Sequence, residues 1–84
     1  MWDALADTNR RAILGLLLDG PQPVGELAEA CGLSQPGASK HLRVLREAGL
    51  VDCERRATWV YYWVKPEALR QLSALLEVAA PAAV

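Results

Sequence analysis

The segment SQPGASKHLRVLREAGL, residues 34–50, combines a regular apolar spacing with small polar and basic residues. Ser34 suits a helix N-cap because its hydroxyl can accept a bond from a free backbone N–H, and Pro36 fits the first helical turn. The apolar residues that recur at intervals of four and three, and so share one helical face, are Ala38, Leu42 and Leu45. The spacing predicts a helix from about Gln35 that ends near Ala48–Gly49, with these three residues in a core.

Two more helices are predicted upstream. The stretch DALADTNRRAILGLLLDG, residues 3–20, ends at an Asp-Gly-Pro breaker and is interpreted as one helix, with a short turn before it as an option; its apolar residues at helical spacing are Leu5, Ile13, Leu16 and Leu17. In VGELAEACG, residues 24–32, a shorter helix has an apolar face of Val24, Leu27, Ala28 and Cys31. Gly32 suits its left-handed cap, so a three-residue turn, 32–34, leads into the next helix.

The pattern changes after residue 50. LVDCERR and TWVYYWVK are rich in β-branched and aromatic residues and flank a short polar turn at residues 56–58, which predicts a β-hairpin. Pro66 then begins an amphipathic helix over about 66–79. The chain has 84 residues, which favours a single domain over 1–84, mainly α with a hairpin (α+β).

The outward face of the 35–48 helix is mostly basic or hydrogen-bonding, and consists of Gln35, Ser39, Arg43 and Arg46, with Lys40 and Glu47 beside them. A helix of this kind after a shorter helix and a tight turn matches a helix-turn-helix motif, whose second helix lies in the DNA major groove. Gln, Arg and Ser side chains can read base edges there. The net charge is −1, but residues 34–58 carry five basic and three acidic residues, against two and five in residues 1–33. Phosphate would therefore be attracted to the middle of the chain.

These residues have plainer interpretations too. Any solvated helix shows such a polar face. His41 lies near the core edge, as a packed histidine or as a phosphate contact. Trp59, Tyr61 and Trp63 alternate on one strand face, for which packing is favoured over stacking on bases.

The segments LADTNRRAILGLL, GELAEACGLSQPGASKHLRVLREAGLV and VYYWV resemble the winged-helix repressors of the ArsR/SmtB family over nearly the whole chain. The resemblance implies a dimeric bacterial transcription factor that binds a palindromic operator and is released by an inducer, with a helix-turn-helix over about 24–48, a wing over about 51–65 and a C-terminal dimerisation helix. Together with the groove argument, it gives nine expected DNA-binding residues: Ser34, Gln35, Ser39, Lys40, His41, Arg43, Arg55, Arg56 and Thr58.

The inducer is not evident from the sequence. The thiolate segment of metal-sensing members is replaced here by Pro-Val-Gly-Glu-Leu at residues 23–27, and the last helix offers only Glu67 and Glu77, so we expect no metal site and no cofactor. Cys31 and Cys53 are expected to be buried structural thiols; the alternative is that one of them senses redox state or a metal. The family's LADPTR-like segment has Thr8 in place of proline, so its helix start is open to change.

A dimer is expected because two copies reach two half-sites, and because the terminal apolar residues exceed the needs of a small core: Trp2, Leu5, Leu69, Leu72, Leu75 and Leu76. The alternative is that they cover their own domain. A protein-interaction module with the same fold is the competing function. An enzyme has little support, since the chain has one histidine and no phosphate loop or nucleophile motif. Lacking a membrane span or signal segment, the chain is expected to be cytoplasmic.

Overall fold

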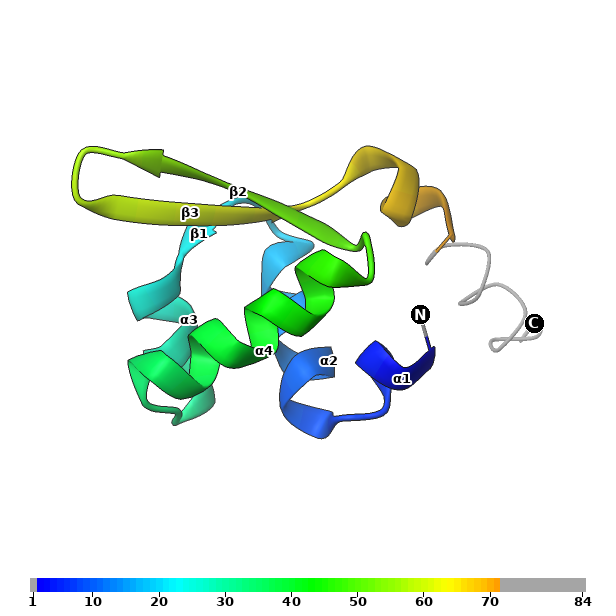
Figure 1. The fold of residues 1–84 in the computed structure, drawn as a ribbon, viewed down its shortest axis with the longest axis horizontal. Helices are drawn as coiled ribbons and strands as arrows, with labels where there is room; N and C mark the ends of the chain where they lie inside the picture. Colours follow the sequence, from blue (N-terminus) through cyan, green and yellow to red (C-terminus); the bar gives the residue numbers. More distant parts are fainter. Residues whose placement is uncertain (1, 72–84) are drawn as a thin grey trace.

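The computed structural model describes residues 2–71, and their side chains from residue 4 onward. Its elements in chain order are α1 (Trp2–Leu5), α2 (Thr8–Leu17), β1 (Gln22–Pro23), α3 (Val24–Cys31), α4 (Gln35–Glu47), β2 (Val51–Arg56) and β3 (Trp59–Val64), followed by a helical segment at 66–71. Figure 1 shows the helices packed together and the β2–β3 hairpin crossing them to project beyond α3. The prediction of a mainly helical domain with a hairpin is confirmed. Within residues 2–71, no helix has the length and apolar character of a membrane span.

The amino-terminal region contains one longer helix, α2, preceded by the single helical turn α1, which agrees with the option of a short turn before the helix; the helical pattern over residues 3–20 is not continuous. Asp7 interrupts it, because its carboxylate accepts hydrogen bonds from the backbone N–H groups of Asn9 (2.8 Å) and Arg10 (3.3 Å) and caps α2. Two arginines of α2 reach back to α1: Arg10 Nε donates to the Ala4 carbonyl at 2.7 Å, and Arg11 Nη1 donates to the Leu5 carbonyl at 2.9 Å. The break therefore satisfies backbone groups on both sides, and α2 begins at the residue that replaces the family's proline.

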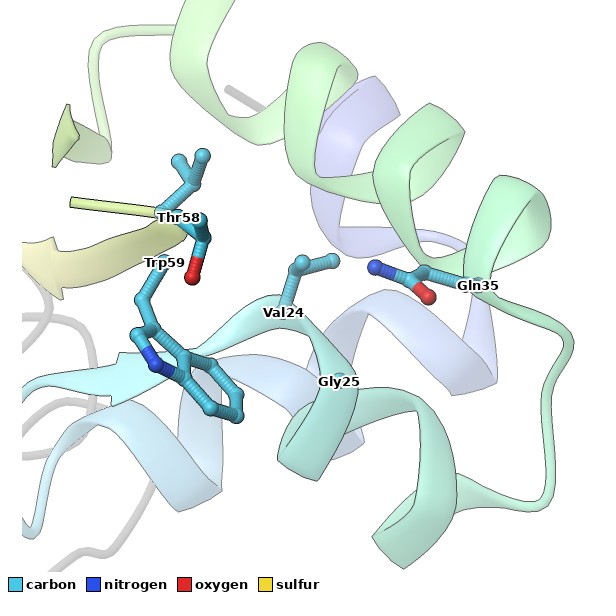
Figure 2. Close-up of a pocket in the computed structure, with 6 residues that line it drawn as sticks. Val24, Gly25, Gln35, Thr58 and Trp59 are labelled. Carbon is cyan, nitrogen blue, oxygen red and sulfur yellow. The ribbon is translucent and has the colours of Figure 1, made fainter. Parts of the chain in front are cut away.

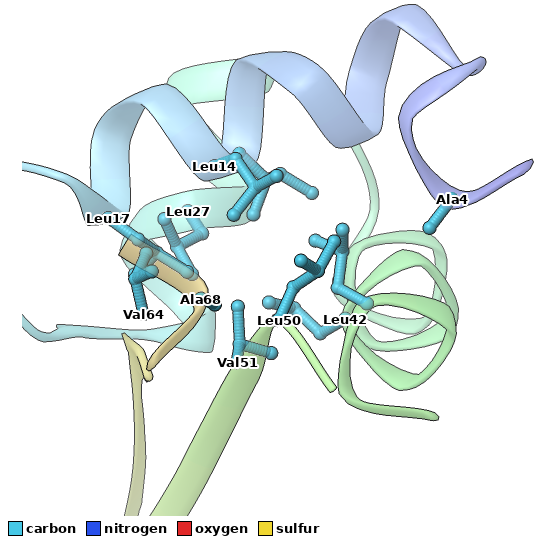
Figure 3. Close-up of a cluster of buried hydrophobic side chains, with 11 residues drawn as sticks. Ala4, Leu14, Leu17, Leu27, Leu42, Leu50, Val51, Val64 and Ala68 are labelled. Carbon is cyan, nitrogen blue, oxygen red and sulfur yellow. The ribbon is translucent and has the colours of Figure 1, made fainter. Parts of the chain in front are cut away.

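The core gathers side chains from every helix and from the base of the hairpin (Figure 3). Ala38, Leu42 and Leu45 of α4 have no exposed surface, which confirms the inward face predicted for this helix. In α2 the fully buried set is Ile13, Leu14 and Leu17, whereas Leu16 is half-buried. Helical spacing therefore predicted the buried face of α2, but it placed Leu16 where the structure has Leu14.

The connection between α3 and α4 has the predicted form. Gly32 adopts the left-handed conformation at φ 67°, and the Leu33 N–H donates to the Ala28 carbonyl at 2.9 Å. Ser34 caps α4, since its Oγ accepts from the Gly37 N–H at 3.1 Å. A Cβ on residue 37 would lie 3.1 Å from the same Oγ, so glycine there leaves the cap undisturbed. Gly49, at φ 80°, follows α4 where a helix stop was expected.

The sheet has three strands in the order β1-β3-β2, all antiparallel. The predicted hairpin is confirmed. In the structure Val51 lies opposite Val64 at its base, and Arg56 lies opposite Trp59 at its tip. Strand β1 was not predicted, because two residues that include a proline carry no strand pattern. The predicted helix from residue 66 is present as far as the structure describes it, to residue 71. Its remaining part, 72–79, falls outside the described residues.

Candidate nucleic-acid interface

The start and outer side of α4 form a continuous polar surface. Five of the predicted DNA-binding residues lie on it, and all are exposed: Ser34, Gln35, Ser39, Lys40 and Arg43. Because Ala38, Leu42 and Leu45 fix the opposite face of the helix in the core, this surface cannot rotate inward without unpacking it. We call these five residues the α4 ridge.

His41 occupies a different position. The residue is half-buried, and its Nδ1 is buried with no hydrogen-bond partner in the part of the chain that the structure describes. Its charge acts on Asp7, at the start of α2. Although partial desolvation raises the pKa of Asp7, the backbone N–H groups of Arg10 and Asn9 and the charges of His41 and Arg10 outweigh that effect, so this pKa lies below 3.8. His41 thus lies at the edge of the α2–α4 packing and not on the α4 ridge.

The hairpin tip supplies the remaining predicted contacts, Arg55, Arg56 and Thr58, and all three are exposed. Arg55 Nε donates to the Ala57 carbonyl at 3.2 Å, whereas Arg56 Nε donates to Glu54 Oε2 at 3.1 Å. As neighbours in one strand, the two arginines point to opposite faces of the hairpin. The turn itself places Ala57 at φ 56°, a left-handed conformation in a residue other than glycine.

The structure brings the tip of the hairpin and the start of α4 to the two sides of one hollow. The hollow has a volume of about 240 Å³ and is lined by Val24, Gly25, Gln35, Thr58, Trp59 and Val60. In Figure 2 the Gln35 amide extends toward Val24, with Thr58 and Trp59 on the far side. Gln35 and Thr58, two predicted DNA contacts more than twenty residues apart in sequence, therefore line the same hollow. We call it the helix–wing hollow.

Trp59, Tyr61 and Trp63 share the outer face of β3, opposite Arg56, Glu54 and Asp52 of β2. They alternate on this strand face as predicted, and none of the three belongs to the core cluster. The core receives Val64 and part of Tyr62 from the other face, while Trp59 is 54% exposed and Tyr61 and Trp63 are half-buried. Tyr61 and Trp63 line a second hollow with Pro21 and Arg56. Trp59 is a candidate functional residue that the sequence argument assigned to packing.

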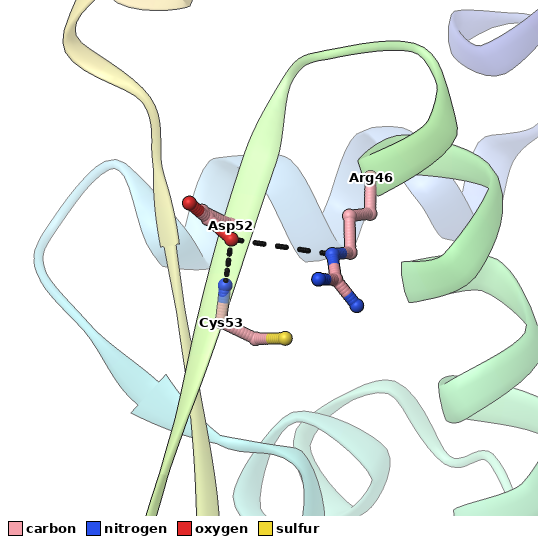
Figure 4. Close-up of polar contacts among 3 residues, drawn as sticks. All are labelled: Arg46, Asp52 and Cys53. Atoms are coloured by element: carbon pink, nitrogen blue, oxygen red, sulfur yellow. Dashed lines mark hydrogen bonds and ion pairs between the residues drawn. The ribbon is translucent and has the colours of Figure 1, made fainter.

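Arg46 extends the polar side of α4 but turns toward the sheet. Its Nε lies 4.0 Å from Asp52 Oδ1, which also accepts the Cys53 N–H at 2.8 Å (Figure 4).

Tyr62 lies on β3, opposite Cys53 of β2. Partial burial and the adjacent Cys53 side chain raise the pKa of Tyr62 above 10.0, against the lowering effect of Arg46. Tyr62 therefore remains a neutral phenol near neutral pH, and Arg46 links α4 to the base of the hairpin.

The thiols of Cys31 and Cys53 are free, and both are half-buried, whereas buried thiols were predicted. Cys31, at the end of α3, packs against the core, and Cys53 lies in β2. Within residues 2–71 no three His, Cys, Asp or Glu side chains come together in a group able to hold a metal ion.

Of the predicted dimer residues, Leu69 is 41% exposed, whereas Leu5 is half-buried and packs against the core. The side chains of Trp2, Leu72, Leu75 and Leu76 lie outside the described residues. Leu69 is thus a large apolar side chain that is partly exposed in the portion of the chain that the structure describes.

Comparison with known proteins agrees with this geometry. A helix-turn-helix domain family matches residues 5–54. The HTH-type transcriptional regulator Rv2034 of Mycobacterium tuberculosis is 49% identical over 72 residues, which cover 84% of this chain and 66% of that protein. The transcriptional repressor SdpR of Bacillus subtilis is 36% identical over 62 residues, covering 74% of this chain and 69% of SdpR. This chain thus spans slightly less than two thirds of the mycobacterial regulator.

A solved structure gives the same result for the fold. The solution structure of the homodimeric winged helix-turn-helix DNA-binding domain Mb0332 from Mycobacterium bovis, a possible ArsR-family regulator, superposes with a TM-score of 0.82. The two are 38% identical, and the match covers 94% of this chain and 73% of that one. The fold and the α4 ridge define a winged helix-turn-helix protein of the kind found in transcriptional regulators. Specifically, the chain belongs to the ArsR family of these regulators.

Proposed function

We propose that this chain is the DNA-binding domain of a dimeric repressor that reads a palindromic operator with α4. One observation carries the proposal: a polar, basic ridge lies exposed on a helix whose opposite face has no exposed surface. A helix held in this way can enter the major groove without losing its own packing. Because DNA is a strong polyanion, Lys40 and Arg43 add attraction at every sequence, while Ser39 and Arg43 can distinguish bases.

The nine predicted DNA contacts divide into groups under this proposal. The α4 ridge faces the major groove, and the hairpin tip, through Arg55, Arg56 and Thr58, faces the adjacent backbone or minor groove, whose negative potential favours arginine. His41 is assigned to the edge of this surface, where it supports α4 against α2. The whole 1–84 region is proposed to act as one winged-helix unit.

A homodimer supplies the second half-site. The proposed interface combines Trp2 and Leu5 with Leu69, Leu72, Leu75 and Leu76; its support is the exposed Leu69 and the homodimeric state named for the Mycobacterium bovis domain. We expect analytical ultracentrifugation at micromolar concentration to give a dimer. A monomer alone would contradict this part of the proposal. An operator on the chromosome would place the protein in the cytoplasm of a bacterial cell.

The test begins with duplexes selected from a random pool by the wild-type chain. Arg43→Ala should weaken binding to a selected duplex by about 1 to 3 kcal/mol and lower the slope of log affinity against log salt by about one. Ser39→Ala should reduce the preference for the selected sequence with no change in slope, because serine carries no charge. Arg70→Ala is the matched control, since it removes the same charge from an exposed position outside the ridge. Ridge variants that bind as the control does would contradict the assignment of α4.

A further inference from the structure

We infer that the helix–wing hollow holds one sugar–phosphate unit of the DNA strand that separates the two grooves, with Trp59 packed against its deoxyribose. The inference rests on the proposed function and adds to it a residue and a contact class. It also gives Gln35 a different role: because its amide lines the hollow, Gln35 contacts the DNA backbone and not a base edge.

The position of the hollow is the first argument. One side is the start of α4, which the proposed function places in the major groove, and the other is the hairpin tip, which it places at the minor groove. Adjacent major and minor grooves of a duplex are separated by one backbone strand. A duplex that contacts both elements must therefore run this strand across the hollow.

The lining of the hollow has the chemistry of a sugar–phosphate unit. Val24, Val60 and the Trp59 ring give apolar walls, and deoxyribose presents an apolar C–H surface. Gln35 and Thr58 supply an amide N–H₂ and a hydroxyl, both of which can donate to phosphate oxygens. Side chains of these types make a large share of the phosphate contacts in protein–DNA complexes.

Trp59 itself lacks a structural role that explains its exposure. Its side chain lines the hollow and is 54% exposed, and it is absent from the core cluster and from the partly buried side chains packed against it. Val64, at the other end of the same strand, is by contrast buried in the core. An exposed indole ring beside two predicted DNA contacts gains apolar contact area only when a ligand covers the hollow.

The first experiment measures affinity for two duplexes, one selected from a random pool and one with the same bases in scrambled order. Trp59→Ala should weaken binding to both by about tenfold, with no change in salt slope, because a sugar contact is neither sequence-specific nor charged. Trp59→Phe should retain most of the affinity. Gln35→Ala should also affect both duplexes equally, unlike Ser39→Ala.

The second experiment uses tryptophan fluorescence with a matched pair of variants. Trp63→Phe keeps Trp59 and removes the other tryptophan of the same strand, so addition of the selected duplex should still change the emission. In Trp59→Phe the DNA-induced change should be largely lost. Circular dichroism and urea unfolding establish that both variants fold as the wild type does.

The outcomes separate this inference from the proposed function. If Arg43→Ala and Ser39→Ala impair binding but Trp59→Ala does not, α4 reads DNA and the inference about the hollow is overturned. If Trp59→Ala weakens dimer formation and not DNA affinity, Trp59 belongs to a protein surface, which also overturns it. If the wild-type chain selects no duplex at all, the proposed function fails first and the inference with it.

Discussion

Helix α4 and the tip of the hairpin are both proposed to contact DNA, but the rest of the molecule supports them differently. The buried face of α4 has no exposed surface at Ala38, Leu42 or Leu45, so the position of the helix depends on the whole core. Residues 54–59 at the hairpin tip are all exposed, and strand pairing with local side-chain bonds maintains them. Substitutions on the buried face of α4 should therefore lower the free energy of unfolding of the whole domain. Substitutions at the hairpin tip should instead change DNA binding or local conformation.

The largest expected effect follows from truncation of the inward face of α4. Leu42→Ala should lower the free energy of unfolding by about 2 to 5 kcal/mol, because it removes buried apolar area and leaves a cavity. Urea denaturation at fixed protein concentration measures the change, since dimer formation would make stability depend on concentration. Leu18→Ala is the matched control: Leu18 is 48% exposed, and its loss should change stability by less than about 0.5 kcal/mol. Equal losses in the two variants would mean that the buried face of α4 contributes no more to stability than an exposed leucine does.

A smaller effect, of opposite sign, is expected at the hairpin tip. Ala57 has φ 56°, where a Cβ is unfavourable, so Ala57→Gly should increase the free energy of unfolding by about 0.5 to 1 kcal/mol. The same exchange at the exposed Ala12, inside α2, should instead decrease it by about 1 kcal/mol, because glycine is a poor helix former. Thermal or urea unfolding compares the pair. If both glycines destabilise the chain, the tip does not have the left-handed turn that strains alanine.

The smallest effect concerns pH, at the edge of the packing between α2 and α4. Since the pKa of Asp7 in the folded chain lies below its ordinary 3.8, the unfolded chain takes up the proton first as pH falls. The stabilisation is present above pH 3.8 and is lost as pH falls through the folded pKa. Asp7→Asn keeps an N-cap acceptor but removes the titration, so the stability of this variant should fall less steeply below about pH 4.

The pH profile is measured as urea unfolding at a series of pH values, with Asp19→Asn as the control that removes a carboxylate from an exposed turn. Asp19→Asn should follow the wild-type profile. If Asp7→Asn follows it as well, then the cap and the positive charges of His41 and Arg10 do not stabilise the carboxylate as the structure implies.

Predictions from sequence succeeded where local chemistry decides the conformation. Ser34 and Gly32 fixed the turn between α3 and α4, and the spacing of Ala38, Leu42 and Leu45 gave the inward face. Whether residues 3–20 form one helix or a helix with a short turn before it stayed open, because a capping aspartate within a helical pattern can either start a helix or lie inside one. The choice depended on Arg10 and Arg11, whose side chains bond the carbonyls at the end of α1.

The errors came from contacts between segments distant in sequence. Strand β1 exists only because β3 offers a partner for Gln22 and Pro23. The alternation of Trp59, Tyr61 and Trp63 shows that they share a face, but an alternating pattern does not say which face of a sheet meets the core. The positions of Val64 and Tyr62 decided this, and they left the aromatic face outside.

The sequence by itself determined α3, α4, the turn between them and the hairpin, because capping, periodicity and β-propensity act over a few residues; these segments also carried the resemblance to the family. Only the tertiary structure decided that Gln35 and Thr58 line one hollow with Trp59, and that His41 lies at the edge of the packing with its Nδ1 buried. The physical reason is that exposure and proximity follow from how the core packs the elements together, and a residue's neighbours in the chain do not specify that packing.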